Sequence, residues 1–224
     1  MNEIFTRIFA IFWKDMLIEI RSKEFVFSVL VFAILELVIF SFAFSIRANM
    51  ADMAASGILW VALTFGGVIG FNRIFAVEKE NARLEGLMLC PVDRSIIYWG
   101  KLAGSFIFML AVAVVVTPIF LILFNLPLLL PRLALIIVLA IIGFAAVGTL
   151  FSAVAINTRA RDIMLPILFL PIIVPVIVAA VKATAPVLAG KAWGDILTWL
   201  QIIIAFDIIY LVVATLVFEF VIEE

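Results

Sequence analysis

The sequence of 224 residues contains no histidine and a single cysteine, Cys90. Histidine is the commonest ligand of zinc and of proximal haem iron, so its absence argues against a metal or haem centre built by this chain. One cysteine excludes an internal disulfide, and beside Pro91 we interpret it as a small apolar residue rather than a haem thiolate. No G-x-x-x-x-G-K-[ST] loop occurs, which excludes ATP binding by that route. The net charge of −1 gives no indication of nucleic acid binding.

Charged residues are scarce as well, at 14% of the chain against 67% hydrophobic residues, and the mean hydropathy is +1.37. Soluble domains are about 45–50% apolar, so this chain lacks the polar surface that a soluble globule needs. Its apolar runs are about 20 residues long, which is the length of a membrane-spanning helix. Because lipid offers no partners to the open edges of a sheet, we predict an all-α integral membrane protein.

Six such runs follow one another in a transmembrane domain that covers residues 25–224. We place the spans at about 25–46, 57–76, 102–124, 133–155, 163–181 and 196–218. In residues 1–24, basic residues share one helical face and apolar residues the other (Arg7, Lys14 and Arg21 against Phe5, Phe9, Phe12, Met16 and Ile20). This pattern indicates an amphipathic helix that lies in the headgroup plane. The alternative is a polar-capped extension of the first span.

Lysine and arginine indicate how the chain crosses the membrane. With the N-terminus in the cytoplasm, that side holds eleven of the basic residues and the other side holds four (Arg47, Arg132, Lys182 and Lys191). Both termini are then expected in the cytoplasm. All the tryptophans fall near span ends, as an interfacial aromatic belt requires (Trp13, Trp60, Trp99, Trp193 and Trp199).

The longest connection expected on the cytoplasmic side, residues 77–100, contains a helical pattern of its own. Leu84, Leu87 and Met88 are spaced i, i+3, i+4, charged residues occupy the other faces, and Pro91 ends the pattern. A short amphipathic helix of this kind can dock into a groove of a soluble partner. The same pattern also fits a solvated loop that lies along the membrane, so both interpretations remain open.

Several stretches together resemble the CcmB family, the membrane permease subunits of the cytochrome c maturation ABC transporter. They are GILWVA (57–62), R-x-F from Arg73 to Phe75, LEGLML-x-P from Leu84 to Pro91, GKL from Gly100 to Leu102 and LPILFLPIIVPVIV (165–178). The resemblance covers essentially the whole chain in length, number of spans and their order. It implies a six-span permease of the ABC-2 type, with residues 1–24 as its elbow helix and a coupling helix in the first cytoplasmic loop.

The resemblance identifies the stretch from Glu78 to Pro91 as this coupling helix, which would contact a separate CcmA-like ATPase subunit. The residues expected at the contact are Arg83, Leu84, Glu85, Gly86, Leu87, Met88, Pro91 and Arg94. Their apolar side chains would fill a groove, their charges would fix the register at its rim, and Gly86 would allow close backbone approach. Other implied partners are CcmC- and CcmD-like membrane subunits, membrane lipid, a second copy or a pseudo-dimer with another membrane subunit, and indirectly a CcmE-like haem chaperone.

The expected function is therefore that of a permease subunit in the bacterial inner membrane. It would couple ATP hydrolysis in the partner to haem export or to release of the haem-loaded chaperone. Haem is then the cargo of the complex and ATP is bound by the partner. We expect no bound cofactor, no metal site and no catalytic residue in this chain, which is not an enzyme on its own. The alternatives are an ABC-2 permease for a lipid, drug or polysaccharide, a proton-coupled secondary transporter, and a structural assembly factor.

Two acidic residues near the middle of their spans, Glu36 and Asp207, are open to two interpretations. An acid at the centre of a span costs about 2.5–3.5 kcal/mol on insertion scales, so it usually faces the interior of a bundle or a water-filled path. In one interpretation the two residues line a translocation route or respond to protons or substrate. In the other, each is protonated or bonded to a neighbour and fixes helix packing.

Proline and glycine are also informative within the spans. Three prolines predict that the fifth span is kinked or partly unwound, either as a gating element or as a fixed bend (Pro166, Pro171 and Pro175). Gly66-x-x-x-Gly70 and Gly148-x-x-x-Ser152 are faces for close helix packing. The sequence leaves open whether these faces pack within one subunit or across a dimer.

Overall fold

The computed structural model describes residues 2–21, 23–44, 51–75, 93–127, 131–156, 158 and 160–221. Over these ranges the chain is helical, without strands, in the order α1 (Asn2–Arg21), α2 (Lys23–Phe44), α3 (Ala51–Ile74), α6 (Arg94–Leu123), α7 (Pro131–Ile156), α8 (Arg161–Leu188) and α9 (Gly194–Val221). Six of these helices, all except α1, are long and apolar enough to cross a membrane. The prediction of an all-α integral membrane protein is therefore confirmed.

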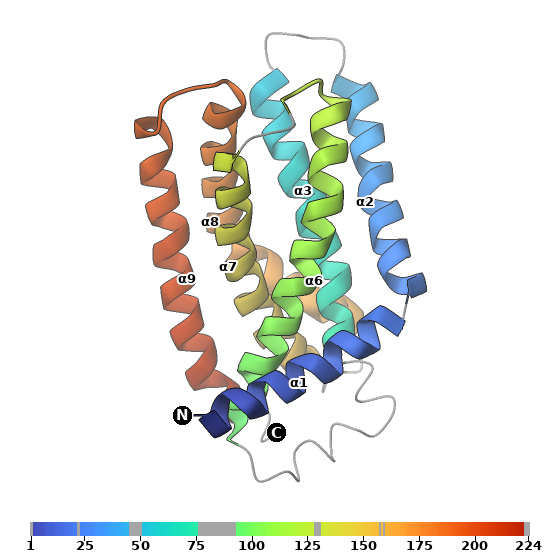
Figure 1. The fold of residues 1–224 in the computed structure, drawn as a ribbon, viewed down its shortest axis with the longest axis vertical. Helices are drawn as coiled ribbons and strands as arrows, with labels where there is room; N and C mark the ends of the chain where they lie inside the picture. Colours follow the sequence, from blue (N-terminus) through green and yellow to red (C-terminus); the bar gives the residue numbers. More distant parts are fainter. Residues whose placement is uncertain are drawn as a thin grey trace.

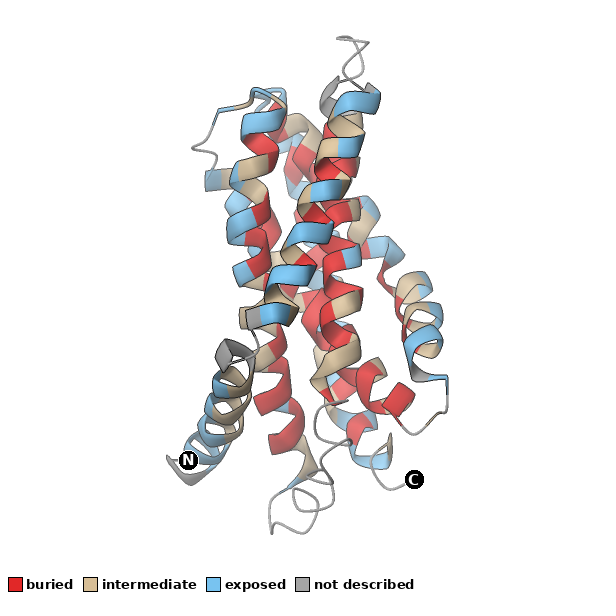
Figure 2. Ribbon diagram, turned by 90° about the vertical axis from the view of Figure 1, so that its right-hand side faces the viewer, coloured by how far each residue is buried: buried red, intermediate tan, exposed pale blue. Residues whose placement is uncertain are grey.

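The six long helices run side by side as one bundle, and α1 crosses one end of it (Figure 1). In the apolar windows of α3 and α7, 72% of the residues are buried, against 17% in α2 and 22% in α9. Buried positions accordingly concentrate along the middle of the bundle in Figure 2. The helices α3 and α7 thus form its centre, while α2 and α9 lie at its outer sides.

Helix α1 presents an apolar face to the outside and packs its other face on the bundle. Phe5, Phe9 and Trp13 are more than half exposed, and the Phe9 and Trp13 rings stack with centroids 6.0 Å apart. On the inner side, a Cβ at Gly100 of α6 would lie 2.7 Å from Cγ2 of Ile11, so only glycine permits this close approach. An exposed aromatic face of this kind suits the boundary between headgroups and acyl chains. Because α1 crosses the bundle end, it does not continue α2 (Figure 1).

Several helices extend beyond the spans that hydropathy predicts, and α6 and α8 extend the furthest. Helix α6 begins at Arg94 rather than at 102, and α8 ends at Leu188 rather than at 181. Both extensions carry polar residues that a hydropathy average counts against a span, yet Lys101 and Thr184 are fully buried inside the protein. Trp60 donates a hydrogen bond from Nε1 to Oγ1 of Thr184 over 3.0 Å and is 1% exposed. The prediction that every tryptophan belongs to an interfacial belt is therefore wrong for Trp60.

Helix α8 contains four prolines within one continuous helix (Pro166, Pro171, Pro175 and Pro186). Its first part is inclined to its second part (Figure 1). Pro171 and Pro175 lie on the exposed side, one turn apart. The opposite side is fully buried, and the Phe169 ring packs 5.4 Å from Phe71 and 5.7 Å from Phe144, measured between centroids. The aromatic contacts thus hold the inner side of α8, whereas two prolines on its outer side have no N–H to donate.

The small-residue faces pack within the subunit. A Cβ at Gly66 would lie 3.6 Å from side-chain atoms of Val112 in α6 and of Val29 in α2. The backbone at Gly148 in α7 lies directly against the Phe71 ring of α3. Ser152, one turn further along α7, donates a hydrogen bond of 2.7 Å to the Phe71 carbonyl oxygen. The absence of a side chain at Gly148 therefore sets the distance between the two central helices.

We predict that Gly148→Ala destabilises the bundle by about 1–3 kcal/mol, because the new methyl group would overlap the buried Phe71 ring. The measurement is the free energy of unfolding in mixed detergent micelles. Gly57→Ala in α3 is the control, since no atom lies within 4 Å of a Cβ there. That change should be neutral or should stabilise by up to about 1 kcal/mol through helix propensity. Equal effects of the two substitutions would contradict the packing described here.

Candidate functional site

The predicted coupling stretch lies outside the described residues, together with Cys90 and most of the residues expected at the contact (Arg83, Leu84, Glu85, Gly86, Leu87, Met88 and Pro91). The structure describes the two helix ends that carry this loop. Helix α3 ends at Ile74 and α6 begins at Arg94, both at the end of the bundle that α1 crosses (Figure 1). The candidate site is therefore built from the groups that hold these two helix ends.

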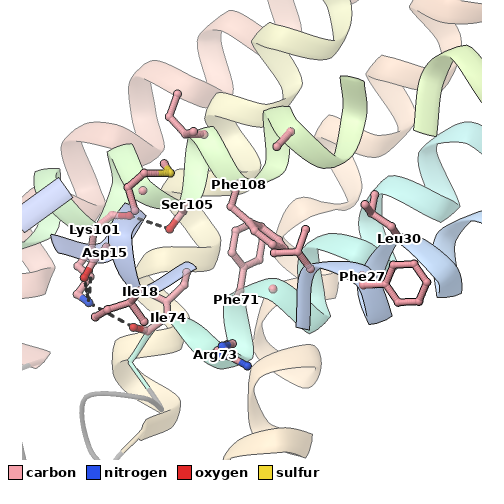
Figure 3. A pocket seen from close by; sticks show the side chains of 16 residues that line it. Asp15, Ile18, Phe27, Leu30, Phe71, Arg73, Ile74, Lys101, Ser105 and Phe108 are labelled. Carbon is pink, nitrogen blue, oxygen red and sulfur yellow. Dashed lines mark hydrogen bonds and ion pairs between the residues drawn. The ribbon is translucent and has the colours of Figure 1, made fainter. Parts of the chain in front are cut away.

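Lys101 of α6 is the centre of this region. Its side chain is 1% exposed, and Nζ lies 3.1 Å from Oδ2 and 3.2 Å from Oδ1 of Asp15 in α1. The same ammonium group donates to the Ile74 carbonyl oxygen at 3.3 Å, in the last turn of α3, and lies 5.1 Å from the Phe75 ring centroid. Figure 3 shows the ion pair and the bond to Ile74. We call these three groups (Asp15, Lys101 and the Ile74 carbonyl) the Lys101 junction.

Charge and backbone chemistry explain why the junction holds. A buried ammonium group is costly unless an anion and acceptors surround it, and Asp15 supplies the anion. The carbonyl groups in the last turn of a helix have no partner within that helix and carry partial negative charge, so Ile74 is a favourable acceptor. One side chain thus joins α1 to both helices that flank the loop between α3 and α6.

Further polar contacts tie α6 to α7 at the same end. The Ser105 hydroxyl donates to the Lys101 carbonyl oxygen over 2.8 Å and shares a hydrogen bond of 2.9 Å with the Thr149 hydroxyl. The Tyr98 hydroxyl donates to the Ala146 carbonyl oxygen over 3.2 Å. All three side chains are buried. Since buried polar groups that are bonded favour one fixed arrangement, these contacts make the region rigid.

Arg94, which the sequence places at the rim of the coupling contact, bonds to the last span. Its Nη1 donates to the Glu219 carbonyl oxygen in the final turns of α9 over 3.2 Å. Phe218 of α9 packs between Tyr98 and Phe75, with ring centroids 5.2 Å and 6.2 Å away. The beginning of α6 therefore holds α9 as well as α1 and α3, so a movement of this helix end would reach most of the bundle.

The two acids within the spans lie apart from each other, Glu36 on α2 and Asp207 on α9 at opposite sides of the bundle (Figure 1). Oε2 of Glu36 and Oδ1 of Asp207 are buried and have no hydrogen-bond partner within the described ranges. Asp207 is 5% exposed, and a Cβ at Gly143 of α7 would lie 2.5 Å from its Oδ1. The missing side chain at Gly143 thus makes the space that the carboxyl group occupies. A single route lined by both acids finds no support in this placement.

Reasoning from the sequence missed Asp15 and the position of Lys101. Asp15 is the single acid among the middle turns of α1, whose other acids, Glu3 and Glu19, lie near its ends, and Lys101 begins a long apolar run. Each irregularity is a weak signal of a buried pair. Among the described residues, no group of three or more cysteine, aspartate or glutamate side chains could hold a metal ion.

The fold and this region define a class, a six-span integral membrane protein whose N-terminal amphipathic helix is bound to the ends of its first long loop. Comparison with known families is more specific. The sequence model of the CcmB protein family matches residues 6–223, and the chain belongs to that family. The resemblance seen in the sequence is therefore confirmed.

Two relatives carry the name heme exporter protein B. The chain is 23% identical over 172 residues to the protein of Pseudomonas aeruginosa, covering 76% of this chain and 77% of that protein. It is 25% identical over 172 residues to the protein of Rhodobacter capsulatus, covering 75% and 78%. The similarity thus extends over most of both partners in each comparison.

We predict that Asp15→Ala destabilises the protein by about 3–5 kcal/mol, because the substitution leaves the Lys101 ammonium group buried without its anion. Adding Lys101→Met should restore most of this loss, since the charge is then removed too. The free energy of unfolding in mixed micelles measures both effects. The exposed Asp195 at the start of α9 is the control, and Asp195→Ala should change stability by less than about 1 kcal/mol. Additive effects of the two junction substitutions would show that the pair is not coupled.

For the second acid, we predict that Gly143→Ala destabilises the bundle through Asp207, because the added methyl group would collide with Oδ1. Asp207→Ala in the same chain should remove this penalty, giving a coupling energy of about 0.5–3 kcal/mol in a double-mutant cycle. The same unfolding assay gives all four values. A coupling energy near zero would mean that the carboxyl group does not occupy the space beside Gly143.

Proposed function

We propose that the chain is the permease subunit of an ABC transporter of the CcmAB type and that it acts in cytochrome c maturation. In this proposal, hydrolysis of ATP by a CcmA-like partner moves the segment from Glu78 to Pro91. The movement drives haem export or the release of a haem-loaded, CcmE-like chaperone. The chain itself makes and breaks no bonds, binds no cofactor, and leaves ATP to the partner and haem to the complex as cargo.

Three observations support the proposal. The chain belongs to the CcmB family, and the two relatives above are named for heme export. Its sequence has no G-x-x-x-x-G-K-[ST] loop, so the subunit that binds and hydrolyses ATP would be a separate chain. The observation that carries the mechanism is the Lys101 junction, because it joins α1, α3 and α6 at the two ends of the loop.

The junction suggests how a push on the loop would be transmitted. Helix α3 enters the loop and α6 leaves it, so a partner that displaces the loop moves both helix ends. Because Lys101 bonds to Ile74 and to Asp15, the two ends and α1 would move as one unit. Arg94 would pass the movement to the end of α9 through Glu219. The ends of the spans opposite α1 would then move apart or together as the bundle tilts.

The proposal includes an orientation and partners. Basic residues gather at the end of the bundle that holds α1, including Arg73, Arg94 and Lys101, and we place this end and both termini in the cytoplasm of a bacterial inner membrane. CcmC- and CcmD-like membrane subunits would complete the complex, with this chain present in two copies or as a pseudo-dimer with another membrane subunit. The exposed faces of α2 and α9 offer the surface for such neighbours or for lipid.

The loop gives the test of this function. We predict that Leu87→Asp or Glu85→Arg leaves the protein inserted but lowers ATPase stimulation and cytochrome c maturation at least tenfold, because the variants put a charge in the groove or reverse one at its rim. Both activities are measured in vesicles that contain the partner ATPase. Full maturation with either variant would contradict the coupling role.

Cys90 provides the control for folding and orientation, since it is the one cysteine of the chain and lies in the loop. A maleimide that cannot cross membranes should label it in inside-out vesicles and not in intact spheroplasts. The loop variants should show the same pattern as the unmodified protein. Labelling from the opposite side would contradict the proposed orientation.

A further inference from the structure

Helix α8 packs on α3, α7 and α9 with one side and leaves its other side exposed. The first part of α8 lies behind α6 and α7, on the side of the bundle away from α1 (Figure 1). The exposed residues recur every three or four positions and form a line along the helix, which we call the α8 stripe (Ile163, Ile167, Pro171, Val174, Pro175, Val178 and Lys182). Between Asp162 and Lys182 the helix has no polar side chain.

Proline changes the backbone chemistry of this stripe. In an α-helix each carbonyl oxygen accepts a hydrogen bond from the N–H group four residues later, and proline has no N–H group. Pro171 therefore deprives the Ile167 carbonyl oxygen of its helical donor, and Pro175 does the same to the Pro171 carbonyl oxygen. Among the residues that the structure describes, no side chain donates a hydrogen bond to either oxygen.

These two acceptors lie where lipid cannot satisfy them. Both belong to the candidate span Asp162–Leu188, and both residues are exposed on the outside of the bundle. Acyl chains carry no hydrogen-bond donor, and a carbonyl group without a partner in hydrocarbon is costly. Spans that contain proline are tolerated where neighbouring helices or water bond to the freed groups. The side chains of the α8 stripe thus suit lipid, whereas its backbone requires donors.

The chemistry of the stripe narrows what covers it. A water-filled path is disfavoured, because the side chains around the two acceptors are all apolar. A two-fold contact between the α8 helices of two copies would place acceptors against acceptors, since neither copy offers a side-chain donor between Asp162 and Lys182. A membrane-spanning helix of a different chain can supply the donors.

We propose that the α8 stripe is the docking face for a membrane-spanning helix of another subunit. That helix carries side-chain donors (hydroxyl, amide or indole N–H groups) about one turn apart, which bond to the Ile167 and Pro171 carbonyl oxygens. The prolines thereby create acceptors for the partner, beyond the bend that they give α8. The inference rests on the proposed function in one respect, that the chain works beside other membrane subunits, and it assigns one of them a face.

The test is photo-crosslinking of the full chain in native membranes that contain the complete set of subunits. The photoreactive amino acid benzoylphenylalanine is incorporated at Val178, an exposed position of the α8 stripe next to the prolines. We expect a crosslink to a membrane-spanning segment of another subunit that has serine, threonine, asparagine, glutamine or tryptophan at a spacing of three or four residues. The same probe at Ile208, exposed on α9, should not reach that segment.

Restoring the missing N–H groups tests the hydrogen bonds themselves. In the double variant Pro171→Ala, Pro175→Ala both carbonyl oxygens regain a donor within α8, so the partner's donors lose their acceptors. The crosslink yield at Val178 should fall about fivefold, as expected for two hydrogen bonds between spans. Pro118→Ala is the matched control, because it restores an N–H group on the exposed side of α6 and should leave this yield unchanged. The thermal midpoint of the double variant should be unchanged or raised, since alanine favours the helix.

The crosslink formed by the chain with all its prolines decides the proposal even if the double variant does not fold. A crosslink to lipid alone, to a second copy of this chain or to a segment without such donors would overturn it, as would an equal yield from a folded double variant. A donor-bearing span from a complex unrelated to cytochrome c maturation would contradict the proposed function and support the docking face. Full maturation with lipid alone at Val178 would do the reverse.

Discussion

An ammonium group lies inside an apolar helix bundle only where other groups take up its charge and its three protons. Lys101 meets this condition with one carboxylate and one helix-terminal carbonyl group, and these two partners come from different helices. The chemical need of one side chain therefore fixes α1 and the end of α3 against α6. The contacts between α1 and the helix ends on either side of the loop depend on this constraint.

Close backbone approach makes the polar contacts of this end possible. Gly100 lets α1 approach α6 at Ile11, and Gly148 lets α7 approach α3 at Phe71. At these separations the Ser152 hydroxyl reaches the Phe71 carbonyl oxygen, and the Ser105 hydroxyl reaches the Thr149 hydroxyl. Within a membrane, where apolar burial between helices gives little net gain, such packing and hydrogen bonds hold spans together. This end of the bundle is thus closely packed and hydrogen-bonded, and it lies next to the loop between α3 and α6.

A half-open pocket beside the Lys101 junction follows from how α1 is attached. Helix α1 is held to α6 at Gly100 and Lys101, whereas α2 turns away to cross the membrane and packs on α3 (Figure 1). An interfacial helix and a departing span enclose a wedge of space that side chains of the two elements do not fill. Its wall is apolar where the spans supply it and charged where the junction supplies it.

The sequence by itself determined the class of fold, the six spans and the family. Apolar runs of span length report burial in hydrocarbon locally, and the family motifs are likewise contiguous. Tertiary structure decided the partners of the polar residues. Asp15 and Lys101 are 86 positions apart and Trp60 and Thr184 are 124 apart, and no local period relates them. It also decided that the glycine faces pack within one subunit and that Glu36 and Asp207 lie on opposite sides. The physical reason is helix rotation: which side chains meet depends on how glycine and aromatic residues seat each helix on its neighbours.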